Sequence, residues 1–297
     1  MLELKLVKES LFLNVLEAIL DLVAVASVSC SSTGLKLQAM DAKGVAFISL
    51  LIPAKEFQFY HCDKDLSMGI AIGDMVEAIR SADKDGTITI KASDENFRNI
   101  TVSIESPECN ETTSFSLLLV TLKRFCIPEL QGLLKKYDAC VQMPSVDFMR
   151  ICKYLSNVDG DVDISTIDKG IRFFALGKCG CLNVKYMQPE KATDIDISVQ
   201  APVSLTLDLK YMNSFAKVSA LSNQVKLCLS KGQPLVVQCK IGQKTKSRII
   251  YLLAPKIKGE IKVEEEDIKD DEIEEEDTKE EETQERKIKR LKGNNKE

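Results

Sequence analysis

Apolar and polar residues alternate along many short stretches of the chain, with the two-residue period that is typical of half-buried β-strands. Such strands are predicted at 86–93, 99–105, 193–200, 224–230 and 234–240. Apolar residues at helical spacing predict amphipathic helices at 10–23, 73–82, 145–157 and 208–217. We expect Ser10 and Ser145 to cap the first and third helices. The runs DKDG and SKGQ are expected to form hairpin turns between strands.

The longest apolar run, residues 11–28, predicts a buried helix rather than a membrane span. Asn14, Glu17 and Asp21 interrupt it, whereas a span needs roughly 20 predominantly apolar residues. The same acids are unlike the apolar core of a signal peptide. We therefore expect a chain that neither crosses a membrane nor enters the secretory route.

A repeat of about 135 residues organises these elements. Residues 29–40 can be aligned with 165–176, because serine stands first and glycine sixth in both segments. Three further blocks match in the same order at an offset of 135: 10–23 with 145–158, 70–82 with 205–217, and 99–105 with 234–240. The sequence therefore predicts two copies of one α+β fold, each with two short helices among antiparallel strands.

The negative net charge of the chain comes from its last segment. Residues 260–297 hold 17 acidic and 9 basic side chains, whereas the other 259 residues hold 28 acidic and 31 basic. The acids are followed by the basic run RKIKRLK at 286–292. We predict a disordered acidic tail at 259–297, whose basic patch is either a nuclear-import signal or incidental.

One stretch, HCDKD at 61–65, offers the side chains of an active site. A catalytic zinc takes three protein ligands, but His61 is the only histidine, and the ten cysteines include no CxxC pair. His61 and Cys62 are neighbours and point to opposite faces of an extended segment, so that the imidazole cannot take the thiol proton. Common phosphate-binding, dinucleotide-binding and hydrolase motifs do not occur in the sequence. We expect no enzyme, no metal and no cofactor, with a metal-dependent hydrolase using 61–65 as the rival interpretation.

Six blocks of the chain resemble one known family, the eukaryotic sliding clamps of the proliferating cell nuclear antigen (PCNA) type. The blocks are LQAMDAKGVAF (37–47), YHCDKDLSMGI (60–70), MPSVDFMRIC (143–152), LDLKYMNSFAK (207–217), PLVVQCKI (234–241) and LLAPKI (252–257). The resemblance implies two clamp domains, 1–119 and 139–258, joined by a connector at 120–138. It also implies a ring of three subunits arranged head to tail, with helices around the hole and sheets outside. Such a ring is linked to DNA topologically and needs no catalytic group.

The resemblance implies a set of residues that face DNA. Five cations match such family positions: Arg80, Arg150, Lys153, Lys210 and Lys217. The first helix departs from the family, because Leu13, Asn14 and Leu20 stand where lysines are usual. Glu77 replaces a further lysine. We expect this half of the hole to attract DNA more weakly.

A hydrophobic groove beside the connector is implied to bind PIP-box peptides, which carry an aromatic pair. The matching positions are Met40, Phe47, Phe125, Ile127, Tyr137, Pro234, Leu252, Ala254, Pro255 and Ile257. The implied partners are the replicative DNA polymerase, the clamp loader, the flap endonuclease and DNA ligase.

The ring contact is implied to join edge strands at 109–119 and 175–185, with Cys179 and Cys181 at the interface. Lys169 is a candidate ubiquitin acceptor, shifted by one residue from the family's Lys-Asp-Gly order. The resemblance thus implies a nuclear homotrimer that encircles double-stranded DNA without reading its sequence and serves as a processivity factor in DNA replication and repair. A subunit of a heterotrimeric checkpoint clamp is the alternative.

Overall fold

The computed structural model describes residues 1–6, 9–81, 86–93, 98–106, 111–122, 137–158, 160–168, 170–178, 180–187, 196–242 and 246–256. Residues Met1–Ile257 form one compact unit. Within the ranges described, no helix is long and apolar enough to cross a membrane.

The chain contains the same series of elements twice. The first series is β1 (Leu2–Leu6), α1 (Glu9–Leu20), β2 (Val25–Ser31), β3 (Gly34–Met40), β4 (Ala46–Pro53), the 3₁₀ turn η1 (Ala54–Glu56), β5 (Phe59–Cys62), β6 (Leu66–Ala71), α2 (Ile72–Arg80), β7 (Thr87–Ala92), β8 (Asn99–Ser106) and β9 (Glu111–Leu118). The second series is β10 (Ala139–Pro144), α4 (Ser145–Leu155), β11 (Asp161–Ile167), β12 (Gly170–Gly177), β13 (Gly180–Met187), β14 (Asp196–Val199), β15 (Ser204–Asp208), α5 (Leu209–Ser219), β16 (Gln224–Leu229), β17 (Leu235–Lys240) and β18 (Arg248–Leu253). Apart from η1, each described element of the first series has its counterpart in the second, so the predicted duplication is confirmed.

The strand pairing repeats as well. The order β5-β1-β7-β8-β9 in the first half corresponds to β14-β10-β16-β17-β18 in the second, and β4-β3-β2-β6 corresponds to β13-β12-β11-β15. Antiparallel pairing of β18 with β4, from Arg248 opposite Leu51 to Leu253 opposite Ala46, fuses two of these groups into a nine-stranded sheet. The mixed α+β architecture with antiparallel sheets agrees with the sequence prediction.

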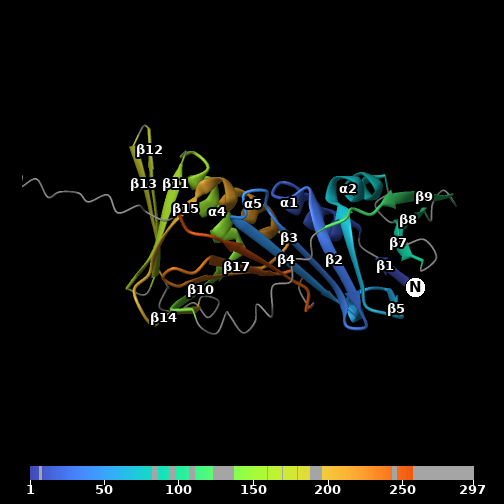
Figure 1. Cartoon of the computed structure of the whole chain (residues 1–297). Helices are drawn as coiled ribbons and strands as arrows, with labels where there is room; N and C mark the ends of the chain where they lie inside the picture. Colours follow the sequence, from blue (N-terminus) through green and yellow to red (C-terminus); the bar gives the residue numbers. More distant parts are fainter. Residues whose placement is uncertain are drawn as a thin grey trace, which may run out of the picture. The chain divides into compact units, whose positions relative to one another are not determined.

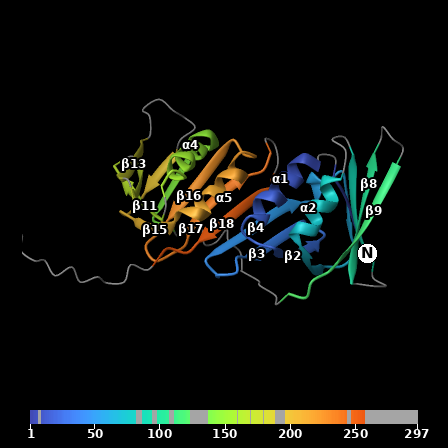
Figure 2. The same cartoon turned by 90° about the horizontal axis from the view of Figure 1, so that it is seen from above.

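The four helices of the described residues contact one another in the order α2-α1-α5-α4 and lie on one side of the nine-stranded sheet (Figures 1 and 2). Their apolar faces are buried in the core, as Leu16 and Ile19 of α1 and Phe148 and Leu155 of α4 illustrate. The buried side chains are the apolar positions of the amphipathic pattern in the sequence. The polar faces of the helices therefore form one continuous exposed layer.

The predicted serine caps are wrong. Helix α1 begins at Glu9, one residue before Ser10. Helix α4 begins at Ser145 itself after Pro144, and the buried Ser145 hydroxyl has no hydrogen-bond partner within the described chain. The backbone N–H of Ser145 instead donates to the carbonyl of Asn223 at 3.0 Å. A tertiary contact thus replaces the local cap at this helix start.

The apolar run 11–28 is not one helix. Helix α1 ends at Leu20, the N–H groups of Leu22 and Val23 both donate to the carbonyl of Ile19, and β2 begins at Val25. The run DKDG, predicted to form a hairpin turn, stands between helix α2 and strand β7, and residues 83–85 lie outside the described residues. The run SKGQ does join β16 to β17, with Gly232 at φ 71°, a value that favours glycine.

Candidate nucleic-acid interface and partner groove

The exposed helix layer carries all five cations that were predicted to face DNA. Arg80 ends α2, Arg150 and Lys153 lie one turn apart on α4, and Lys210 and Lys217 lie near the two ends of α5. All five are exposed. The fold therefore brings together, on one side of the sheet, residues that are far apart in the sequence.

Four of these five cations are paired with carboxylates of the same chain. Arg80 Nη2 lies 2.5 Å from Glu17 Oε1, and Lys217 Nζ lies 2.5 Å from Asp21 Oδ2. Arg150 Nη2 lies 2.7 Å from Asp147 Oδ1, and Lys210 Nζ lies 3.8 Å from Asp208 Oδ2. No ion pair to Lys153 occurs among the residues that the structure describes.

Helix α1 and the residue that follows it supply acids to this surface, and the helix itself carries no lysine. Glu17 reaches across to α2, and Asp21, just after α1, reaches across to α5 of the second half. The paired cations are 49–61% exposed, so each pair contributes only about 0–1 kcal/mol to stability. The main effect of the pairs is therefore on charge, because they neutralise cations that would otherwise attract phosphate.

The opposite face of the nine-stranded sheet carries an apolar row that runs across six strands. Neighbours in the row are direct cross-strand partners, so their side chains share one face of the sheet. In strand order β10-β16-β17-β18-β4-β3 the row consists of Cys140, Cys228, Val236, Leu252, Phe47 and Met40. Together with Tyr137 and Ile250 these residues form an apolar cluster separate from the main core. We call this row and its two neighbours the groove floor.

Seven of the ten predicted partner-binding residues lie on or beside the groove floor. Met40, Phe47, Tyr137 and Leu252 belong to the cluster. The Tyr137 hydroxyl donates to the carbonyl of Pro234 at 3.0 Å, and the Ala254 N–H donates to the carbonyl of Val45 at 2.9 Å. Burial, with the nearby thiols of Cys228 and Cys140, raises the pKa of Tyr137 to about 12. Pro255 follows Ala254 in the same segment.

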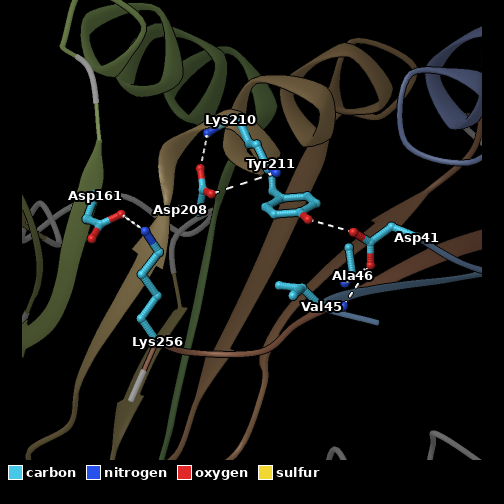
Figure 3. Close-up of polar contacts among 8 residues, drawn as sticks. All are labelled: Asp41, Val45, Ala46, Asp161, Asp208, Lys210, Tyr211 and Lys256. Carbon is cyan, nitrogen blue, oxygen red and sulfur yellow. Dashed lines mark hydrogen bonds and ion pairs between the residues drawn. The ribbon is translucent and has the colours of Figure 1, made fainter. Parts of the chain in front are cut away.

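A polar network borders the groove floor and joins the two halves of the chain (Figure 3). The Asp41 carboxylate accepts hydrogen bonds from the N–H groups of Val45 and Ala46 at 2.7 Å and from the Tyr211 hydroxyl at 2.6 Å. Burial and the bond to Asp41 raise the pKa of Tyr211. Lys256 forms an ion pair with Asp161, which raises the lysine pKa. Tyr211 and Asp161, both from the second half, thus hold in place the turn after Asp41 and the segment that ends at Lys256, beside the groove.

Four residues of the groove floor were missed from the sequence: Cys140, Cys228, Val236 and Ile250. A signal for two of them was present. Val236 stands two residues after Pro234 in the predicted strand 234–240, and Ile250 stands two residues before Leu252. Strand alternation, extended from the predicted groove positions, would have found these two, whereas Cys140 and Cys228 are placed only by the pairing of β10 with β16.

Strands β9 and β13, which contain most of the predicted edge segments 109–119 and 175–185, each lie at the edge of a sheet. Residues 175–177 belong instead to β12, inside the sheet. The counterparts of β9 and β13 in the repeat are β18 and β4, which pair with each other. Phe115 of β9 and Leu182 of β13 are only partly buried. Their counterparts Tyr251 and Ile48 are fully buried at the β18–β4 contact. The edge strands β9 and β13 therefore carry side chains equivalent to those of the β18–β4 contact, which forms within the chain.

The stretch 61–65 is a strand end and turn. His61 is exposed and Cys62 is partly buried on the other face of β5. His61 Nε2 lies 2.7 Å from Asp63 Oδ1, whereas the Cys62 thiol donates to the carbonyl of Lys64 at 3.1 Å. Burial and the nearby Asp65 carboxylate raise the pKa of Cys62. This thiol therefore lacks both the base and the lowered pKa that a nucleophile needs.

Several predicted residues lie outside the described residues. They are Phe125, Ile127 and Ile257 of the groove, Cys179 of the edge, Lys169, and the tail. Their assignments stay predictions, as do the domain bounds 1–119, 120–138, 139–258 and 259–297.

Comparison with known protein families finds two matches, which together cover almost the whole described chain. Residues 1–124 match the N-terminal domain of proliferating cell nuclear antigen, and residues 127–256 match its C-terminal domain. The boundary between the matches falls where the first series of elements has ended and the second has not begun.

Proposed function

The chain belongs to the proliferating cell nuclear antigen family, the non-catalytic sliding clamps of DNA replication, and on that premise we propose that it closes into a homotrimeric ring around duplex DNA. One observation carries the proposal. The contact between β18 and β4 joins the two halves of the chain, while their repeat counterparts β9 and β13 are left at sheet edges. Pairing β9 of one subunit with β13 of the next would repeat the internal contact and cover both edges.

The internal contact predicts the register of the contact between subunits. Leu252 lies opposite Phe47, and Tyr251 lies opposite Ile48. The counterparts of these pairs, found through the matching β8–β9 and β12–β13 pairings, are Ser116 with Cys181 and Phe115 with Leu182. In this register the partly exposed Phe115 and Leu182 side chains bury each other.

A homotrimer is favoured over a subunit of a heterotrimeric checkpoint clamp because both complementary edges belong to one chain. Each edge presents apolar side chains at alternate positions, with Phe115 and Leu117 on β9 and Leu182 and Val184 on β13. Head-to-tail contacts of this kind form a closed ring when the rotation between subunits is a simple fraction of a turn. A subunit of a checkpoint clamp would instead pair its edge strands with those of two different chains.

Within the ring, the helix layer would face double-stranded DNA. Arg80, Arg150, Lys153, Lys210 and Lys217 are proposed to make sequence-independent phosphate contacts. Because four of the five cations are paired internally, such contacts are expected to be weak. Weak contacts suit a clamp that has to slide and that stays on DNA through its closed shape.

The groove floor is proposed to bind PIP-box peptides of a replicative polymerase, clamp loader, flap endonuclease and DNA ligase. Its apolar row offers a site for aromatic and aliphatic anchors, which supply most of the affinity at such interfaces. Phe125, Ile127 and Ile257 are proposed to complete the groove. A nuclear location is proposed along with these functions. Lys169 is the proposed modification site.

A cysteine cross-link tests the ring contact. The variant Ser116→Cys should form a disulfide with the native Cys181 of the next subunit, because directly opposite residues lie about 4.5–5.5 Å apart between Cα atoms, within the disulfide range. Non-reducing electrophoresis should then show covalent dimers and trimers. Ser114→Cys is the matched control on the same face of β9, since its predicted partner is Asn183. Equal cross-linking of both variants, or cross-linking of neither, would contradict the predicted register.

A further inference from the structure

Two cysteines face each other at one end of the groove floor. Cys140 of β10 is the direct cross-strand partner of Cys228 of β16. Both thiols belong to the same apolar cluster, in which Cys228 is fully buried and Cys140 is partly buried. Neither cysteine is part of a disulfide. Of the seven free cysteines in the described part of the chain, only these two are direct cross-strand partners.

The geometry of this pair suits a disulfide. Directly opposite residues of antiparallel strands have Cα atoms about 4.5–5.5 Å apart, and disulfides span about 4.4–6.8 Å. The two thiols already interact, since hydrogen bonding with Cys140 and burial both raise the pKa of Cys228. The two sulfur atoms are therefore within reach of each other, and only a small approach of the two strands is needed to join them.

We propose that Cys140 and Cys228 are a redox modification site, at which hydrogen peroxide or a related hydroperoxide forms a disulfide within the groove floor. The partly buried Cys140 meets the oxidant first, because burial and the raised pKa disfavour the thiolate of Cys228, which acts only in the second step. Its sulfur attacks the peroxide, the O–O bond breaks, and a sulfenic acid and water are formed. The Cys228 sulfur then displaces the hydroxyl group, which leaves as a second water. In total, two thiols lose two hydrogens, and one peroxide is reduced to two waters.

The disulfide acts on the groove by changing the shape of its floor, and this consequence rests on the proposed peptide-binding function. Opposite Cβ atoms lie about 4.5–5.5 Å apart in a sheet but about 3.8 Å apart in a disulfide. Oxidation therefore pulls β10 toward β16 beside Val236 and Tyr137, which contact the pair. Packed surfaces tolerate such shifts poorly, so oxidation weakens binding of an apolar peptide.

The experiment uses the full chain, reduced or treated with stoichiometric hydrogen peroxide. Alkylation followed by peptide mapping should find Cys140 linked to Cys228 in the treated protein and no such link in Cys140→Ser. Calorimetry with a synthetic PIP-box peptide should show a Kd raised about tenfold by oxidation, restored by a dithiol reductant, and unchanged by peroxide in Cys140→Ser. Cys62→Ser, which removes a partly buried thiol outside the groove, should respond as the wild type does.

Each result decides one part of the proposal. Cys140 and Cys228 that remain reduced after a treatment that oxidises other cysteines of the chain would overturn the modification site. A disulfide that leaves the Kd unchanged, or a Kd that shifts equally in Cys140→Ser, would overturn its effect on the groove. If the reduced protein binds no peptide, the proposed partner function fails, while peptide mapping still decides whether the disulfide forms. The variant Cys228→Ala repeats the test without relying on Cys140→Ser alone.

Discussion

The hydroxyl of Tyr211, in helix α5, donates a hydrogen bond of 2.6 Å to the carboxylate of Asp41, 170 residues earlier in the chain. Asp41 in turn accepts hydrogen bonds from the N–H groups of Val45 and Ala46 (Figure 3). The Val45 carbonyl accepts a hydrogen bond from the N–H of Ala254. The Tyr211–Asp41 bond therefore connects the helix layer of the second half with the turn that borders the groove floor in the first half. Both halves are needed to build this side of the groove.

The variant Tyr211→Phe removes this bond without changing the shape of the side chain. We expect the free energy of unfolding to fall by about 1–2 kcal/mol, because a hydrogen bond to a charged group is lost. Peptide binding should weaken as well, since Tyr211 no longer fixes Asp41 and the turn that contains Val45, to which Ala254 is hydrogen-bonded. Urea denaturation and calorimetry measure the two effects. Tyr154→Phe on the exposed face of α4 is the control, and an equal loss of stability in both variants would contradict the role of the bond.

The Asp41 carboxylate should make stability depend on pH. Burial alone would raise the pKa of Asp41, but hydrogen bonds from Tyr211, Ala46 and Val45 outweigh it and hold the pKa below its ordinary value. The stabilisation is therefore present above the pKa of the unfolded carboxyl, about 3.9, and is lost as pH falls through the lower pKa of the folded state. The difference in unfolding free energy between wild type and Asp41→Asn should shrink below about pH 4. If the difference stays constant down to the acid unfolding transition, the Asp41 carboxylate does not contribute to the pH dependence of stability.

The ion pairs of the helix layer should limit its affinity for DNA. Glu17→Gln releases Arg80, so binding to duplex DNA should strengthen and its dependence on salt should steepen, by up to about 0.9 in log–log slope for each added phosphate contact. Lys153→Ala should make the slope shallower. Titrations over a range of salt concentrations measure both. Glu105→Gln makes the same charge change at an exposed position of strand β8, outside the helices, and an equal effect there would show that only net charge matters.

The aromatic side chain of Phe115 should be an anchor of the ring contact. Truncation of a central aromatic residue typically costs about 2 kcal/mol or more, so Phe115→Ala should weaken each subunit contact about thirtyfold. Sedimentation at decreasing concentration should show dissociation of this variant where the wild type stays assembled. Phe59→Ala removes an exposed phenylalanine of β5 and should leave the assembly unchanged. Dissociation of both variants alike would argue against β9 as the contact.

Much of the fold could be predicted because the chain repeats itself and its strands alternate clearly. The runs 99–105 and 234–240 became β8 and β17, in matching places in the two halves. The errors lie where tertiary contacts decide the structure. Ser145 is not a cap because Asn223 accepts from its N–H, and the run 11–28 breaks after Leu20 because β2 pairs with β3 and β6.

The candidate site was predicted only in part, because spatial pairing is not written in any local pattern. The cations of the helix layer were identified, but their partners Glu17 and Asp21 come from another helix and from the segment that follows it. Cys140 and Cys228 stand 88 positions apart in the sequence and meet only through the register of β10 and β16. Pairings of this kind require the folded sheet.

The mass of the assembly in solution tests the ring most directly. Native mass spectrometry or light scattering of the purified chain alone should give three times the 33.1 kDa of one chain. That result, together with cross-linking of Ser116→Cys to Cys181, is what pairing of β9 with β13 predicts. A monomer that assembles only when other clamp subunits are added would contradict the homotrimer and favour the checkpoint clamp.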